Sequence, residues 1–210
     1  MLASLIAAFR LPDLRKRIVF VFGMFAVFVV GLHIPVPGID RDQMEALFNS
    51  GSLLGLVDVF SGGALKKFTI FAMGIAPYIN ASIIMQLLTV AVPQLEALAK
   101  EGEHGRKKIS QYTRYLTVIL AVIQAVGITK MLQGMKIMTA SNLELIPIVI
   151  TLAAGTSFLM WVGEQITDRG IGNGVSLVIF AGIMASLPYQ VTETLRFTAA
   201  GAIQIWQLVL

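Results

Sequence analysis

Apolar stretches long enough to cross a lipid bilayer alternate with short polar connections along this sequence. A membrane-crossing helix needs roughly 20 predominantly apolar residues, with about 17 as the lower limit. Hydrophobic residues make up 56% of the chain and charged residues only 13%, which is far from the composition of soluble proteins. The sequence therefore predicts an all-α membrane protein, a polytopic helical bundle. Five stretches reach the required length, at about residues 18–34, 68–92, 115–132, 145–162 and 171–187.

Prolines predict where some of these helices end. A Pro-Val-Pro-Gly turn at 35–38 follows the first stretch, Pro93 follows the second and Pro188 the fifth, and we expect each to close its span. Residues 1–17 do not read as a signal peptide, because their apolar part precedes the basic cluster. We expect this segment to be amphipathic and to lie on the membrane surface. Residues 196–210 become apolar again and predict the start of a truncated sixth span.

Basic residues predict the orientation of the chain. If the spans alternate, ten Lys and Arg residues share the side of the N-terminus and six lie on the other side. Cytoplasmic loops of membrane proteins carry the excess of Lys and Arg. The N-terminus is therefore expected in the cytoplasm.

One apolar segment, residues 52–65, is too short to span. It has about 14 residues and contains Asp58, a length typical of a re-entrant or interfacial segment. It leads directly into the second stretch, so it can fold back into a cavity that the second span lines. An amphipathic helix on the outer surface fits the composition equally well.

The second stretch carries polar residues and a proline where lipid would surround a simple span. Irregular backbone at that depth must face protein or a water-filled cavity. Helical spacing places Ile75, Ile79, Ser82 and Gln86 on one face, apolar at its outer half and polar at its inner half. Ordinary packing against neighbouring helices explains this face. A pore with a wet vestibule and an apolar constriction explains it as well, because such constrictions hold back ions by dewetting.

The connection at residues 100–114 predicts a basic cytoplasmic hairpin. The positive-inside signal accounts for most of its charge, while Arg106, Lys107 and Lys108 are candidates for contact with an acidic partner or anionic lipid. The sequence offers no cluster of metal ligands, no hydrolytic triad and no phosphate-binding loop. We expect neither a cofactor nor an enzymatic activity.

Four motifs together resemble the SecY family, the channel subunits of bacterial preprotein translocases. They run in the family's order across nearly the whole chain. The resemblance implies ten spans in two pseudo-symmetric halves of five, with residues 18–195 as the N-terminal half and residues 196–210 as the hinge and the start of span six. The motifs are IPVPGID (34–40), FSGGALKKFTIFAMGIAPYINASIIMQLL (60–88), KEGEHGRKKISQYTRYLT (100–117) and WVGEQITDRGIGNGVSLVIFAGI (161–183).

The resemblance also implies roles for particular residues. Ile75, Ile79 and Ile179 match members of an apolar pore ring, and Asn80, Gln86 and Gln124 are candidates for the lateral gate. The resemblance favours the re-entrant alternative for residues 52–65, as a plug that closes the channel from outside. The plug consists of Ser52, Leu53, Leu54, Gly55, Leu56, Val57, Asp58, Val59, Phe60, Ser61, Gly62, Gly63, Ala64 and Leu65.

The function implied by the family is passage of unfolded secretory proteins across the bacterial inner membrane and lateral release of signal or transmembrane segments into it. The implied partners are the SecE and SecG subunits, the SecA motor ATPase or the ribosome, preproteins with signal sequences, and phospholipid, with no nucleic-acid site in this half. Two other classes stay open from the residues alone. A secondary transporter would show ion-dependent uptake of a small molecule, and a membrane scaffold would not conduct after removal of the plug.

Overall fold

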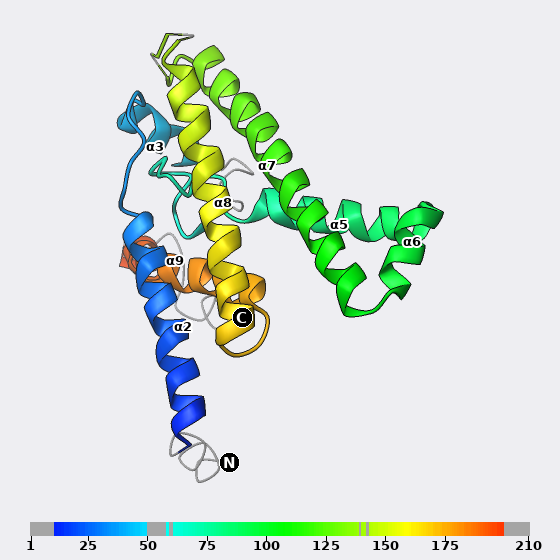
Figure 1. The fold of residues 1–210 in the computed structure, drawn as a ribbon. Coiled ribbons are helices and arrows are strands. Elements are labelled where there is room, and N and C mark those ends of the chain that lie inside the picture. The colour runs from blue at the N-terminus through cyan, green and yellow to red at the C-terminus, as the bar shows by residue number, and fades with distance from the viewer. Residues whose placement is uncertain (1–10, 50–57, 59–60, 139, 142, 200–210) are drawn as a thin grey trace.

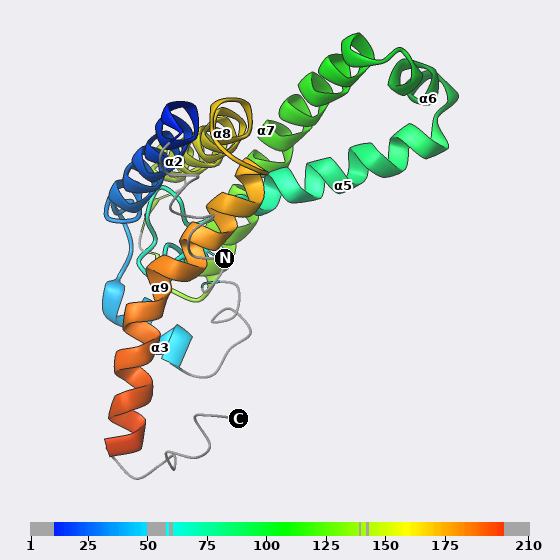
Figure 2. The same ribbon diagram turned by 90° about the horizontal axis from the view of Figure 1, so that it is seen from below.

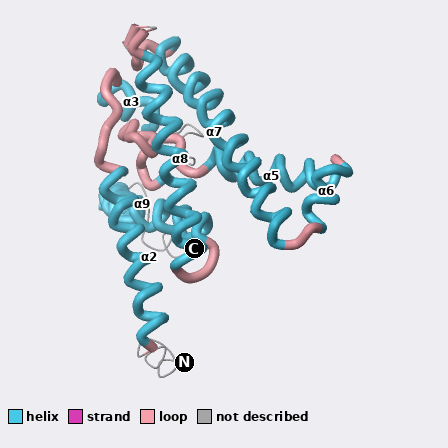
Figure 3. The backbone as a smooth tube through the Cα atoms, in the orientation of Figure 1, coloured by secondary structure: helices cyan, strands magenta, loops and turns pink. Residues whose placement is uncertain are grey.

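The computed structural model describes residues 11–49, 58, 61–138, 140–141 and 143–199. These parts of the chain form helices joined by turns and contain no strand (Figure 3). The all-α fold class is therefore confirmed. The helices are α2 (Pro12–Gly31), α3 (Arg41–Asn49), α5 (Ala76–Ala91), α6 (Pro93–Lys100), α7 (Glu103–Gly134), α8 (Leu145–Arg169) and α9 (Gly174–Ala199).

Three of these helices are long and apolar enough to cross a membrane, namely α7, α8 and the part of α9 over Gly174–Thr192. The pair α5 and α6 makes a fourth candidate if the two helices count as one broken span, bent by 99°. Helix α2 has 20 residues, but four of its first six are charged. The predicted total of five spans and a plug therefore stays a prediction.

Helices α2 and α8 lie side by side, and α9 runs behind them in the view of Figure 1. Helix α5 leaves this group at an angle, and α6 and the first turns of α7 complete an arm that points away from α2. The view from below shows the same arm (Figure 2). Helix α7 then returns to pack along α8.

The structure corrects the expected start of the second helix. Residues 68–75 are turns, and helix α5 begins at Ala76, so Pro77 stands in its first turn rather than in the middle of a helix. Proline is well tolerated there because the first N–H groups of a helix have no intrahelical partner. Pro93 likewise begins α6, and it marks the bend between α5 and α6.

Two other boundaries differ from expectation. The prediction that Pro188 ends the fifth helix is wrong, because α9 continues through it. Proline inside a helix costs about 3 kcal/mol, but neighbouring groups in membrane helices can satisfy the freed carbonyl. The loop expected at residues 100–114 is almost entirely helical, with only a short turn between α6 and α7, where Gly102 has φ +77°.

The N-terminal boundary proposed after residue 17 falls inside α2, which starts at Pro12. Residues 1–10 and 200–210 lie outside the described residues, as does most of the expected plug, residues 52–57 and 59–60.

Buried apolar residues form two clusters. The first joins α3, α7, α8 and the connections between them, around Met44, Leu132 and Leu152. The second cluster joins α2, α8, α9 and the turns before α5, and it contains the expected ring positions. Its buried members are Val21, Phe28, Leu32, Ala64, Phe71, Ile75, Leu159, Val162, Ile166, Val178 and Ala181.

Candidate functional site

Residues 62–75 lack regular helix although they lie among the candidate spans. Unpaired N–H and C=O groups are costly away from water, so such a segment needs partners for its backbone. Part of it pairs with the turn after α2: the Val36 N–H donates to Phe68 O at 2.9 Å, and the Ile70 N–H donates to Ile34 O at 3.0 Å. The segment is therefore fastened to the end of α2.

An aromatic stack fixes the middle of the same segment. The Phe71 ring lies between the rings of Phe28 and Phe158, with centroid distances of 5.8 and 6.1 Å and interplanar angles of 6° and 7°. Gly31 makes room for this stack, since a Cβ there would lie 1.9 Å from the Phe71 ring. The irregular segment thus packs against both α2 and α8.

The start of the segment is organised by Asp58. Its Oδ1 accepts hydrogen bonds from the Leu65 and Lys66 N–H groups, each at 2.9 Å, and from Ser61 Oγ at 3.2 Å. Burial raises the pKa of the Asp58 carboxyl above its ordinary value, and the hydrogen bonds that it accepts oppose this shift. The sequence marked Asp58 only as a charge in a short apolar segment; an Asp followed three residues later by Ser-Gly-Gly was the available signal for a turn.

The three expected ring residues meet in the second apolar cluster. Ile75 immediately precedes α5 and is only 6% exposed, while Ile79, one turn into α5, and Ile179, in the second turn of α9, pack against the cluster. Two helices and one irregular segment thus bring separate parts of the sequence to one apolar site.

The structure separates the three lateral-gate candidates into two groups. Asn80 and Gln124 line one hollow of ≈ 280 Å³ between α5 and α7. Gln86 lines a different hollow of ≈ 250 Å³ between α5 and α9, and its Nε2 donates to Ser82 Oγ at 3.4 Å. Asn80 and Gln86 are six residues apart, about one and two-thirds helical turns, so they point to different sides of α5.

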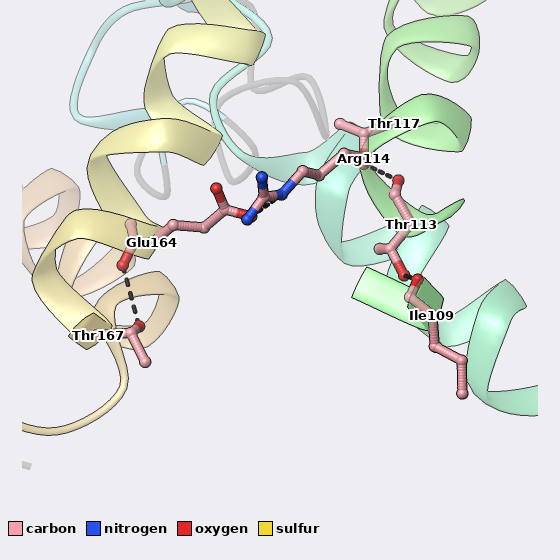
Figure 4. A network of polar contacts seen from close by, with 7 residues as sticks. Ile109, Thr113, Arg114, Thr117, Glu164 and Thr167 are labelled. Atoms are coloured by element: carbon pink, nitrogen blue, oxygen red, sulfur yellow. Dashed lines mark hydrogen bonds and ion pairs between the residues drawn. The ribbon is translucent and has the colours of Figure 1, made fainter. Parts of the chain in front are cut away.

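The basic candidates Arg106, Lys107 and Lys108 are all exposed in the first turns of α7. Farther along the helix, Arg114 Nε donates to Glu164 Oε1 at 2.6 Å and ties α7 to α8 (Figure 4). Glu164 is only 17% exposed, so this pair joins the arm to the rest of the protein at a partly buried position. The sequence alone does not reveal this pair, because its members are 50 residues apart.

Groups of three or more potential metal ligands do not occur among the described residues. The described residues provide an apolar cluster, a hollow on either side of α5 with one or more amide side chains, and an exposed basic turn.

Comparison with known proteins identifies the family of this chain. The family model described as SecY matches residues 69–210. The protein translocase subunit SecY of Pseudomonas aeruginosa is 50% identical over 202 residues, which cover 95% of this chain and 46% of that protein. The chain therefore spans about half the length of this relative.

Solved structures share the fold. A structure of a protein-conducting channel superposes with a TM-score of 0.58 at 19% identity, covering 81% of this chain and 36% of that one. A SecY structure concerned with the plug domain gives a TM-score of 0.54 at 20% identity, covering 80% of this chain and 35% of the other. With the family model matching well over half of its length, this chain belongs to the SecY family.

Proposed function

We propose that this chain forms one half of a protein-conducting channel, with Ile75, Ile79 and Ile179 as part of the apolar ring at its constriction. The observation that carries the proposal is that one apolar cluster contains Ile75 as a buried member and has Ile79 and Ile179 packed against it. The membership in the SecY family and the likeness to a protein-conducting channel support it.

An apolar ring suits the passage of an unfolded chain. Its side chains can move apart around many sequences and bind none of them tightly, so the translocating chain can slide. In the resting state the same side chains exclude water and so hold back ions. Residues 52–65 act as the plug that completes this seal from outside.

The two hollows beside α5 have different roles in the channel. The hollow with Asn80 and Gln124 belongs to the lateral gate, where a signal segment gains about 25 cal/mol per Å² of apolar surface that it buries. This gain opens the gate only as far as the segment prefers the open state over the closed one. The hollow with Gln86 and Ser82 faces the inner vestibule, through which the polar substrate chain enters.

The proposal extends to location and partners. The chain lies in the bacterial inner membrane with its N-terminus in the cytoplasm, and residues 18–195 form the N-terminal half of the channel between the segment 1–17 and the hinge region 196–210. Arg106, Lys107 and Lys108 lie exposed where a cytoplasmic partner, SecA or the ribosome, meets the channel. SecE and SecG complete the complex, and the motor or the ribosome supplies the energy of transport.

Cross-linking to an arrested preprotein tests this function. The chain contains no cysteine, so single cysteines at Ile75, Ile79 and Ile179 can be introduced into an otherwise cysteine-free complete protein. A preprotein halted midway and carrying one cysteine should form disulfides with all three positions. Ile150, which is 61% exposed on α8 and lines neither hollow beside α5, is the control and should not react. Equal cross-linking at Ile150 and at the ring positions overturns the proposal.

A further inference from the structure

The chain around Asp58 folds into a tight turn, formed by Asp58 and residues 61–66, that we call the Asp58 turn. Besides the three bonds to Asp58 Oδ1, Ser61 Oγ contacts Asp58 O at 2.9 Å and the Gly63 N–H donates to Asp58 O at 3.0 Å. Gly62 and Gly63 have φ of +72° and +80°, a region that other residues rarely adopt. The turn is also well buried, since Ala64 is 0% and Leu65 8% exposed.

One side of the Asp58 turn touches the segment that carries Ile75. A Cβ placed on Gly74 would lie 3.8 Å from Ser61 Cβ, which is ordinary contact distance. Gly74 immediately precedes Ile75 in the chain. Ser61 therefore lies beside the backbone that precedes Ile75.

The other side of the turn touches α9. A Cβ placed on Gly62 would lie 3.1 Å from both Cα and O of Gly182. Gly182 stands three residues after Ile179, less than one helical turn away. The Asp58 turn thus lies between the two elements that carry Ile75 and Ile179.

We propose that Asp58 is a positioning residue for the pore ring: it folds the Asp58 turn into a spacer that sets the separation between Ile75 and Ile179. This inference rests on the proposed function only for the role of the ring, because the contacts of the turn stand by themselves. A carboxylate accepts hydrogen bonds more strongly than a neutral group does. Here it gathers two backbone N–H groups and one hydroxyl in a stretch whose glycines give it little stiffness of its own.

Cross-linkers of different length measure this separation. The complete translocase, otherwise free of cysteine, carries cysteines at positions 75 and 179 and is treated with bifunctional thiol reagents of increasing span. With Asp58 intact, one narrow range of reagent lengths should join the two positions. Asp58→Ala should lower the yield of these reagents several-fold and raise that of both shorter and longer ones. Asp58→Asn keeps one acceptor oxygen and should lie between the two.

Asp40→Asn is the matched control. Asp40 also accepts hydrogen bonds in a loop, from Gln43 N–H at 3.2 Å and Gln43 Nε2 at 2.9 Å, but it is not part of the Asp58 turn. Its replacement should leave the cross-linking pattern unchanged. An unchanged pattern in a folded Asp58→Ala translocase overturns the inference. If that variant does not fold, Ser61→Ala should shift the pattern in the same direction to a smaller extent, and a folded Ser61→Ala variant without any shift overturns it equally.

The outcome separates this inference from the proposed function. If Asp58→Ala changes the spacing while the arrested preprotein does not react at position 75, the spacer exists and the assignment of the ring is wrong. If the preprotein reacts at position 75 and the spacing stays fixed, the ring stands and the role of Asp58 is wrong.

Discussion

Replacing Ile75 by aspartate introduces a carboxylate into the second apolar cluster, where the isoleucine is only 6% exposed. Loss of the buried apolar side chain gives up roughly 1.5–3 kcal/mol. A carboxylate that remained dry and unpaired would cost several kcal/mol more. Entry of water avoids this second cost, so we expect the constriction to become wet. Since about 1.4 kcal/mol corresponds to a factor of ten, the loss of burial alone should raise the wetted fraction roughly 10- to 150-fold.

Single-channel recording of the complete complex in a planar bilayer measures this change as more frequent cation conductance at rest. The conductance of Ile75→Asp should fall as the pH drops and the carboxyl becomes neutral, whereas Ile75→Asn should leak without this pH dependence. Val90→Asp introduces the same charge at an exposed position of α5 and should leave the seal intact. A resting leak that does not increase in a folded Ile75→Asp complex would refute the reasoning that this isoleucine keeps the constriction dry.

Three further outcomes are expected. Deleting residues 52–57 from the complete protein should produce a folded channel that leaks ions in bilayer recordings. Deleting residues 52–65 should increase the leak further, because it also removes most of the Asp58 turn. Tight sealing after either deletion contradicts the plug assignment. Gly155→Ala should destabilise the protein by about 1–3 kcal/mol in thermal unfolding, because its Cβ would lie 1.9 Å from the backbone carbonyl oxygen of Ile70. Gly127 has open space around it, so Gly127→Ala should be neutral or stabilising. Equal effects at both sites contradict this packing. Hydrogen bonds to the ionised carboxyl lower the pKa of Glu144 from 4.5. The contribution of this carboxyl to stability is therefore present above its ordinary pKa and is lost as the pH falls through the lowered value. An NMR titration midpoint at or above 4.5 contradicts this expectation.

The positions of the helices followed from the sequence because burial in lipid leaves a strong local signal. Each predicted apolar stretch overlaps one helix among α2, α5, α7, α8 and α9. Boundaries were less predictable where polar sequence continued a helix, as in α7, which begins at Glu103 rather than near residue 115. Hydropathy marks the part of a helix that suits lipid, and it gives no information about turns that extend beyond it.

The prolines in this chain occur in two structural settings, at the start of a helix and inside one. Pro77 and Pro93 both start helices, as the missing N–H allows, but Pro188 lies within α9. The sequence before Pro188 is apolar and the sequence after it is mostly polar, and whether the helix ends or continues depends on what satisfies the freed carbonyl. That choice is made by tertiary contacts, which a single sequence does not display.

The ring positions were predicted through family resemblance, while the contacts that hold them in place were not predicted. The helical period aligned Ile75 with Ile79, but Ile179 is a hundred residues away and joins them only through packing of α9. In the same way, the Gly31 gap for Phe71 and the contact between Gly62 and Gly182 are visible only in three dimensions.

Irregular backbone among membrane helices needs residues that fit tight turns and acceptors for its free N–H groups. In this protein glycine meets the first need and Asp58 the second. Gly62 permits close approach to α9 because it carries no side chain, and Gly74 adopts a φ of +56°, which other residues rarely adopt. The same absence of side chains leaves the backbone free to adopt many conformations, and every N–H that leaves a helix still needs an acceptor. Asp58 supplies one strong acceptor for two such groups, and its burial cost, seen in the raised pKa, is offset in part by the bonds that it receives. An apolar residue at position 58 would avoid the cost of burial but leave these N–H groups without that acceptor, so a buried carboxylate is the better choice for this turn.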